Sequence, residues 1–356
     1  MKKESKTILD NPKHIFVIAE AGSNWKAGSY DKDIKRATNL IKVAAKSGAD
    51  AIKFQTYNPK TVYVPNAGKS RYLTKSGINK NIFELFQEYS MPHKMLKDLS
   101  IICKKEKILF MSTPFSVDDA KKVNKFVKIH KIAAFEINHV RLLEYLASTK
   151  KPIIISTGAS NFSDIDYAVK LLKKKGVKTI CLLQTTSKYP TPIESLNLKA
   201  ILELKKRYQV PIGLSDHSTE PILGPTLAIG LGATIIEKHF TLNKKFRGPD
   251  HNFALNPKEL NQLIKTIRES EKALGDGVKK ILKEEEELRK FATRSIQAIK
   301  DIEKNEIFVE GKNINILRSG NQKRGEDARF LTKIIRKKSN KKIKLGQGVF
   351  LKDCQE

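Results

Sequence analysis

The chain has 356 residues, which is long enough for one large α/β domain and a small second one. Its net charge is +30, from 68 Lys and Arg against 38 Asp and Glu. The lysines occur along every predicted helix instead of gathering on one basic face with interleaved aromatic residues. This distribution argues against nucleic acid as the main partner and leaves an anionic small substrate as an explanation.

The three cysteines are Cys103, Cys181 and Cys354, and they show neither disulfide spacing nor metal-ligand spacing. This pattern is typical of the reducing cytoplasm. The basic N-terminus is not followed by an apolar stretch of signal-peptide length, and no apolar run approaches about 18 residues. We therefore expect a cytoplasmic protein that does not associate with a membrane.

Eight apolar runs of β type alternate with helical patterns along the chain. The runs are IFVIAE (15–20), DAIKFQT (50–56), ILFMSTPF (108–115), VKIHKIAAFE (127–136), PIIISTG (152–158), TICLLQTTS (179–187), VPIGLSD (210–216) and ATIIEKHF (233–240). Near-continuous hydrophobic strands joined by helices form parallel sheets, so eight such units predict an α/β fold, the (β/α)8 TIM barrel. An open doubly wound sheet is the lesser alternative, because no G-x-G-x-x-G turn follows the first run.

Helix signals mark the first and last helices of this barrel. Apolar residues recur at helical spacing from Ile34 to Ala45, and Gly48 is the expected end of that helix. Asn256, Pro257 and Glu259 form an N-terminal capping pattern for the last helix, which is expected to run to about residue 274.

A Gly-Asp-Gly break at 275–277 indicates the end of the barrel domain, which we place at residues 1–277. Residues 278–291 are rich in charged side chains, which indicates a short helix or a linker. Residues 292–356 have short alternating runs and predict a compact, mostly β module.

Polar residues end most of the predicted strands. They are Glu20, Lys53, Gln55, Ser112, Thr113, Lys131, Glu136, Ser156, Thr157, Gln184 to Ser187, Tyr189, Ser215, Asp216, His217, Glu237 and His239. Active sites of (β/α)8 barrels lie at the C-terminal ends of the strands, so these residues are candidates for one site.

Lys53 and Lys131 could hold a phosphate or a carboxylate, with neighbouring hydroxyls completing the contacts. The alternative is that they only form ion pairs with Glu20 or Glu136. His217 and His239 follow the last two strands and are placed like two ligands of a divalent ion.

Two loops beyond the strands add candidates for ligand contacts. RGPDHNF (247–253) places Asp250 and His251 over the barrel end, where an aspartate can bind hydroxyl groups. SKYPTP (187–192) is a rigid loop whose two prolines follow Tyr189 and fix it, which favours a ligand-facing position.

Nine motifs together resemble those of one known family. VIAEAGSNW, IKFQTY, MSTPF, HKIAAFE, ISTGAS, LLQTTSKYPTP, GLSDHS, IIEKHFTL and GPDHNFALNP follow, in order, the motifs of the sialic acid synthase (N-acetylneuraminate synthase) family. The C-terminal segment resembles that family's antifreeze-protein-like (SAF) domain. The resemblance covers essentially the whole chain.

The resemblance implies an enzyme that condenses phosphoenolpyruvate with an N-acyl amino sugar, either N-acetylmannosamine or a 2,4-diacetamido sugar. The products are a nine-carbon 2-keto sugar acid and phosphate. It also implies a divalent metal ion on His217 and His239, which is Mn²⁺ by preference, with Mg²⁺ or Co²⁺ as alternatives. A homodimer is implied, in which the C-terminal domain of one subunit covers the partner's barrel.

The resemblance assigns roles residue by residue. The phosphoenolpyruvate positions are Lys53, Thr113, Lys131, Ser156, Ser187 and Ser215. The sugar positions are Glu20, Tyr189, Asp250 and Arg318, and Gln55 completes the predicted substrate-binding set. Glu136, His217, His239 and Lys131 are the predicted catalytic residues, with Glu136 handling water or protons.

Four positions depart from the family's usual motifs. Ala134 replaces a serine, Ser187 an asparagine, Trp25 a histidine and Ser319 a proline. These changes concern the identity of the sugar more than the type of reaction. Two alternatives stay open: another aldehyde acceptor such as arabinose 5-phosphate, and a non-catalytic protein that binds carbohydrate or nucleic acid.

Overall fold

The computed structural model describes residues 8–11, 13–70, 74 and 78–355. The chain divides into two compact units, Met1–Gly275 and Asp276–Glu356. Among the described residues, no helix combines the length and the apolar character needed to cross a membrane.

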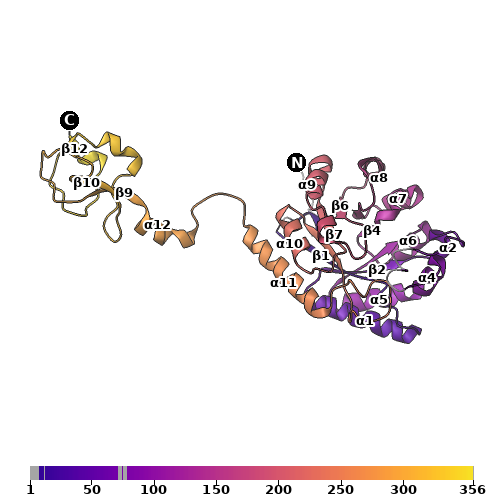
Figure 1. The fold of residues 1–356 in the computed structure, drawn as a ribbon. Coiled ribbons are helices and arrows are strands. Elements are labelled where there is room, and N and C mark those ends of the chain that lie inside the picture. The colour runs from indigo at the N-terminus through magenta and orange to yellow at the C-terminus, as the bar shows by residue number, and fades with distance from the viewer. Residues whose placement is uncertain (1–7, 12, 71–73, 75–77, 356) are drawn as a thin grey trace. The chain divides into compact units, whose positions relative to one another are not determined.

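The first unit contains eight parallel strands. They are β1 (Phe16–Gly22), β2 (Ala51–Thr56), β3 (Leu109–Pro114), β4 (His130–Ile132), β5 (Ile153–Ser156), β6 (Ile180–Thr185), β7 (Ile212–Asp216) and β8 (Ile235–His239). They form one sheet in the order β3-β2-β1-β8-β7-β6-β5-β4, and its two end strands lie in contact. The sheet thus nearly closes into the predicted (β/α)8 barrel (Figure 1).

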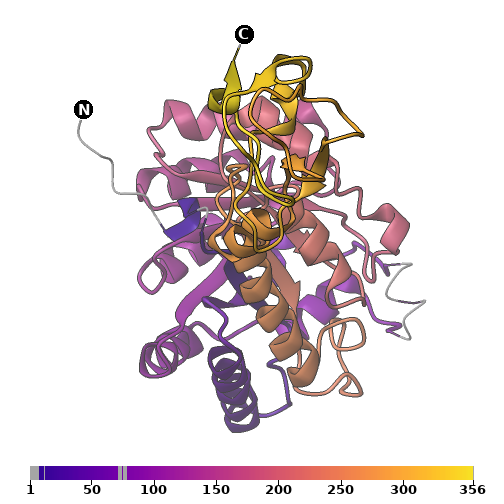
Figure 2. The same ribbon diagram turned by 90° about the vertical axis from the view of Figure 1, so that its left-hand side faces the viewer.

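Helices surround the strands. They are α1 (Tyr30–Ser47), α2 (Pro59–Val62), α4 (Ile82–Tyr89), α5 (His93–Lys105), α6 (Val117–Asn124), α7 (Val140–Ser148), α8 (Phe162–Lys174), α9 (Ala200–Tyr208), α10 (Leu223–Gly230) and α11 (Pro257–Leu274). The strands are buried on both faces, which explains their near-continuous hydrophobic sequences. The first and last helices, α1 and α11, pack together, as the indigo and orange helices of Figure 2 show.

The predicted helix ends are present. α1 ends at Gly48, whose φ of 88° is left-handed and whose N–H bonds to the last turn. The Asn256 side chain caps α11 by accepting from the backbone of Glu259, whose carboxylate accepts from the Asn256 N–H in return.

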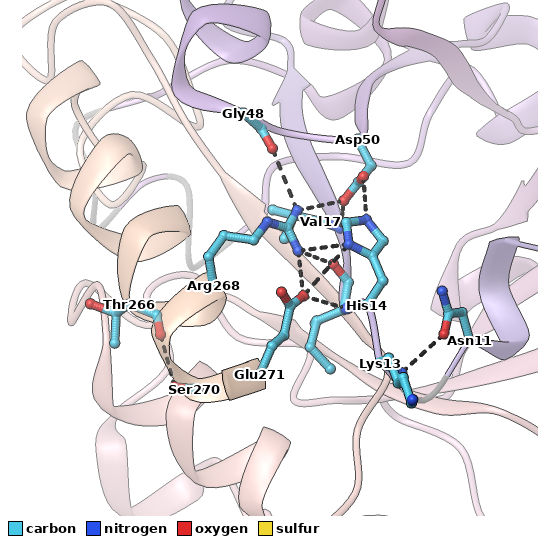
Figure 3. Close-up of polar contacts among 11 residues, drawn as sticks. Asn11, Lys13, His14, Val17, Gly48, Asp50, Thr266, Arg268, Ser270 and Glu271 are labelled. Atoms are coloured by element: carbon cyan, nitrogen blue, oxygen red, sulfur yellow. Dashed lines mark hydrogen bonds and ion pairs between the residues drawn. The ribbon is translucent and has the colours of Figure 1, made fainter. Parts of the chain in front are cut away.

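A polar network ties α11 to the N-terminal end of the barrel (Figure 3). Arg268 donates to Asp50 Oδ2 at 3.0 Å and to the carbonyl of Ile15 at 2.9 Å. Asp50 also accepts from the Val17 N–H at 2.8 Å and contacts His14 at 2.6 Å. Polar groups at the N-terminal end of a barrel contribute to its stability, because the chemistry takes place at the C-terminal end.

The second unit is small and contains two antiparallel pairs of strands. β9 (Arg294–Ala298) pairs with β10 (Ile314–Arg318), and β11 (Lys338–Ser339) pairs with β12 (Cys354–Gln355). A short helix, α12 (Glu286–Ala292), precedes them. The small core consists of Ile296, Ala298, Ile302, Phe308, Ile314, Ile334, Ile343 and Val349. The proposed boundaries at residues 277 and 292 stay predictions, as does the likeness to an SAF domain.

Candidate active site

Polar side chains replace apolar ones at the C-terminal end of the barrel, here called the mouth. Residues two apart on a strand share one face. On the inward face, a buried apolar residue is followed two positions later by a polar one. The pairs are Ile18 and Glu20, Ala51 and Lys53, Met111 and Thr113, Ile129 and Lys131, Ile154 and Ser156, and Ile235 and Glu237. The apolar residues of these pairs form a lower layer that fills the barrel. The polar residues form an upper layer, at the mouth, which contains the candidate site.

Two lysines and two carboxylates meet in this upper layer. Lys53 Nζ lies 2.6 Å from Glu20 Oε2 and 3.7 Å from Glu237 Oε1. Lys131 Nζ lies 3.8 Å from the same Glu237 oxygen. The ion pair of Lys53 with Glu20, one alternative raised from the sequence, is therefore present. Glu237 was a strand-end candidate without an assigned role, although its two-residue spacing from His239 indicated the same inward face.

Hydroxyl groups surround both lysines. Lys131 Nζ donates to Ser156 Oγ at 2.7 Å, and Lys53 Nζ donates to Thr113 Oγ1 at 3.2 Å. Ser215 Oγ donates to Glu237 Oε1 at 3.0 Å. The structure thus brings two predicted hydroxyls to the ammonium groups and a third, that of Ser215, to the adjoining Glu237, in an arrangement that suits a phosphate or carboxylate.

Burial shifts the titration of this cluster. Burial and the nearby Lys53 lower the pKa of Lys131 to about 8, although Glu237 opposes the shift. Burial alone would raise the pKa of Glu237, but the two lysines and the Ser215 hydroxyl lower it to about 2. At neutral pH the lysines therefore carry charge beside an ionised Glu237.

His217 and His239 lie side by side in the mouth. Their ring centroids are 5.6 Å apart, and the rings are inclined at 70°. His217 Nδ1 lies 2.9 Å from the carbonyl of Thr186, and Tyr189 stacks on the His217 ring at 4.2 Å. Phe253 packs against His239 at 5.1 Å. These contacts fix the two imidazoles close together.

The two imidazoles fit a divalent metal ion. Burial lowers the pKa of both His217 and His239 to about 3, so both rings are neutral, as metal ligands must be. His239 Nδ1 is buried without a hydrogen-bond partner. Within the described parts of the chain, His, Cys, Asp and Glu form no group of three that could hold a metal. The two histidines therefore suit an ion that has few protein ligands and keeps several coordination positions open for water or substrate.

Glu136 follows β4 in a short 3₁₀ turn, Ala134–Glu136. Its side chain is buried, and Oε2 has no hydrogen-bond partner. Burial raises the pKa of Glu136 to about 7, although Lys131 opposes the shift. A carboxyl poised near neutral pH can accept or donate a proton.

Three of the predicted substrate-binding residues, Glu20, Gln55 and Asp250, make hydrogen bonds at the ends of β1 and β2 and in the loops beyond. Gln55 Nε2 donates to Glu20 Oε1 at 3.2 Å. Asp250 Oδ2 accepts from the Ser23 N–H at 3.0 Å and from Ser23 Oγ at 2.7 Å. A Cβ at Gly22 would lie 2.7 Å from the same Asp250 oxygen, so the close approach of this loop requires glycine.

The Ser187 hydroxyl is buried, without a hydrogen-bond partner, beside Gly158. A Cβ at Gly158 would lie 2.3 Å from Ser187 Oγ, which explains the glycine in this strand-end turn. An unpartnered buried hydroxyl is costly, and a bound ligand would relieve that cost.

Three residues singled out from the sequence lie elsewhere. Trp25 is buried in the main apolar core, which places it among core residues and not along the mouth. His251 is buried and contacts Thr241 Oγ1 at 2.7 Å, so it stabilises its own loop. Arg318 is exposed on β10 of the second unit.

A (β/α)8 barrel with buried lysines, hydroxyls and a histidine pair at its mouth defines a class of anion-binding barrel enzymes. The NeuB family model matches residues 40–279, and the chain belongs to this family.

Several relatives and solved structures are similar to the chain. It is 40% identical over 303 residues to N,N'-diacetyllegionaminic acid synthase of Campylobacter jejuni. This alignment covers 84% of this chain and 89% of the relative. It is 36% identical over 354 residues to pseudaminic acid synthase of the same species, with 98% of each chain covered. The solved N-acetylneuraminic acid synthetase of Leptospira borgpetersenii, in complex with citrate, has a TM-score of 0.68 and 35% identity, and covers 78% of this chain and 91% of its own.

Proposed function

We propose that the chain condenses phosphoenolpyruvate with an N-acyl amino sugar and water to give a nine-carbon 2-keto sugar acid and phosphate. C3 of phosphoenolpyruvate forms a bond to the sugar aldehyde carbon, water adds at C2, and the C–O bond to the phosphate breaks. The observation that carries this proposal is the position of two buried lysines, with their hydroxyls, beside two neutral histidines in one mouth.

The lysine cluster suits phosphoenolpyruvate. Lys53 and Lys131 attract its phosphate and carboxylate as point charges. The hydroxyls of Thr113, Ser156 and Ser215 complete the hydrogen bonds, and the unpartnered Ser187 hydroxyl lies free to join them. Because these groups are buried, their interactions with an anion are stronger than in water.

A second group of residues suits the sugar. Glu20, Gln55 and Asp250 present acceptors and an amide for hydroxyl groups, and Tyr189 forms an aromatic wall beside His217. Glu136, with its pKa near 7, is the residue we assign to the proton transfer that accompanies addition of water.

His217 and His239 would hold the divalent ion, with Mn²⁺ preferred and Mg²⁺ or Co²⁺ as alternatives. When bound, such an ion supplies Lewis acidity to the sugar carbonyl. The protein's own part is to keep both imidazoles neutral and close together.

We further propose a homodimer in which Arg318 of one subunit contacts the sugar's acyl group in the partner's barrel. The exposed position of Arg318 at the end of β10 supports this role, because the side chain is available to a second molecule. A cytoplasmic location also stays a prediction.

Mass spectrometry of reactions with purified protein, phosphoenolpyruvate, Mn²⁺ and single candidate sugars tests the function. The panel contains N-acetylmannosamine and the 2,4-diacetamido sugars that would give legionaminic and pseudaminic acids, with arabinose 5-phosphate and erythrose 4-phosphate as the competing acceptors. We expect a nine-carbon acid with one amino sugar, no product with a chelator and none with His217→Ala. Product only with a sugar phosphate would instead favour the other aldehyde acceptors. Absence of any product across the panel would contradict the proposal.

A further inference from the structure

A buried ion pair lies behind the two histidines. Lys238 Nζ is 2.6 Å from Asp216 Oδ2, and the two side chains are 2% and 0% exposed. The two residues face each other across β7 and β8, where Asp216 and Lys238 are register partners. Because neighbouring residues on a strand point to opposite faces, this pair lies on the helix side while Ser215 and Glu237 face the mouth.

The ion pair also holds the turn that contains His217. Lys238 Nζ donates to the Ser218 carbonyl at 3.0 Å and to Ser218 Oγ at 3.3 Å, and Asp216 Oδ1 accepts from the Ser218 N–H at 2.7 Å. The residues before and after His217 are thus bound to the residue before His239.

Gly224 lets α10 cover the carboxylate. A Cβ at this position would lie 2.9 Å from Asp216 Oδ2, so only glycine lets the helix approach this closely. A buried ion pair is seldom a net source of stability, since an apolar pair of the same size often serves equally well. Its best-attested use is to fix one arrangement of the surrounding chain.

We infer that Asp216 and Lys238 are positioning residues that set the separation and orientation of the His217 and His239 rings and thereby the affinity for the metal ion. The inference rests on the proposed function, in which these histidines hold the ion. Neither residue touches substrate or metal. Outer groups that orient metal ligands typically change metal affinity about 10- to 100-fold when removed.

Equilibrium dialysis of the full-length chain against Mn²⁺, without substrates, tests the inference. Removing only one charge leaves the other buried and unpaired, so the main variant is the double substitution Asp216→Asn with Lys238→Met. We expect it to fold, as judged by circular dichroism, and to bind Mn²⁺ about 10- to 100-fold more weakly. The Co²⁺ absorption spectrum of the double variant should also differ from that of the parent. The single variant Lys238→Arg, which keeps the positive charge, should retain most of the parental affinity for Mn²⁺.

Lys175→Met is the matched control. Lys175 follows α8 and forms an ion pair with Glu144 of α7 at 3.4 Å, on elements that carry neither histidine. Its loss should leave Mn²⁺ affinity unchanged. If this double variant does not fold, Asp216→Asn with Lys238→Gln, which removes both charges and keeps two polar side chains, is judged by the same criterion.

The outcomes separate the two claims. Parental Mn²⁺ affinity and an unchanged Co²⁺ spectrum in a folded variant would overturn the inference and leave the metal site intact, provided that His217→Ala abolishes binding. Failure of the parent to bind Mn²⁺, or binding that survives His217→Ala, would remove both the metal assignment and the inference.

Discussion

Lys131 and Glu136 both have pKa values close to neutral pH, because the pKa of the lysine is lowered and that of the glutamate is raised. Burial raises the pKa of Glu136 to about 7 and lowers that of Lys131 to about 8. The Glu136 carboxyl is therefore ionised only above about pH 7, and the Lys131 ammonium is charged only below about pH 8. A mechanism that needs a basic Glu136 and a cationic Lys131 has both between these values.

This pair predicts the pH dependence of the reaction. The kcat/KM for phosphoenolpyruvate should fall as the pH drops through about 7 and again as it rises through about 8. Glu136→Gln should lower kcat by about 10²- to 10⁴-fold and make the acidic limb less steep, because Glu20, whose pKa burial also raises to about 7, still titrates. Steady-state phosphate release from pH 5.5 to 9.5 measures both effects.

The Glu144→Gln variant serves as the control for this profile, because Glu144 is only partly buried, lies on the outer helix α7 and contacts Arg141. It should reproduce the parental profile. An acidic limb that persists unchanged in Glu136→Gln would assign the titration to another group.

Sequence alone located many residues of the mouth, because the C-terminal ends of parallel strands meet at one end of a barrel. It did not separate the two faces of a strand, so Asp216 was included although it lies on the helix side with Lys238. Glu20, Lys53, Thr113, Lys131, Ser156 and Ser215 were each predicted at strand ends and lie together in the structure. Glu237 has the same periodicity but was left unassigned, since spacing does not reveal that one carboxylate contacts two lysines.

The loops after β1 and β8 are joined at the part of the mouth that we propose binds the sugar. Ser23 donates twice to Asp250, and Asn24 Nδ2 donates to the Phe240 carbonyl at 2.9 Å. Asp33, near the start of α1, accepts from the backbone of Ala27 at 2.6 Å and so holds the first loop in place. Asp250 is thus positioned by an element far from it in sequence.

Ser23→Ala should weaken sugar binding selectively. It removes one hydrogen bond to a carboxylate, and such bonds contribute about 1.5–3 kcal/mol, which corresponds to about a 10-fold or larger rise in KM for the sugar. The KM for phosphoenolpyruvate should change little. Initial rates with each substrate varied in turn provide the measurement.

Ser148→Ala removes a serine hydroxyl from the exposed end of α7 and should change neither constant. Equal increases in both KM values for Ser23→Ala would indicate a general disturbance of the barrel and contradict a specific role through Asp250.

Elements were predicted unequally well. The eight strands were found because buried parallel strands have long apolar runs, but β4 is limited to His130–Ile132 since a 3₁₀ turn begins within the same apolar run. Trp25, which replaces the family's usual histidine in the loop after β1, packs in the core. A one-dimensional pattern does not tell whether a loop aromatic residue points inward or toward a ligand.

The whole molecule combines a barrel unit with a small C-terminal unit, and the proposed dimer requires both. In that dimer each complete site takes its barrel from one subunit and Arg318 from the other. Closed two-fold assemblies allow such reciprocal contributions. The sequence of the second unit suggested this arrangement only through resemblance, because its short strands carry no motif for a partner.

Mixed dimers test the proposed sharing. Arg318→Ala and His217→Ala chains should each be almost inactive, but a dimer of the two contains one site in which both residues are intact. Random exchange of equal amounts gives mixed dimers in half of the population, so about one quarter of parental activity should return. Activity after denaturation and refolding together, compared with separate refolding, gives the measurement. Absence of recovery in confirmed mixed dimers would contradict the shared site.

In the proposed condensation, the C–O bond of phosphoenolpyruvate breaks. Phosphoenolpyruvate labelled with ¹⁸O at the bridging oxygen distinguishes this reaction from attack of water at phosphorus. With the accepted amino sugar and Mn²⁺, we expect the label to leave with the phosphate and the nine-carbon acid to carry none of it. Label retained in the organic product, or phosphate released without any sugar, would contradict the proposed condensation.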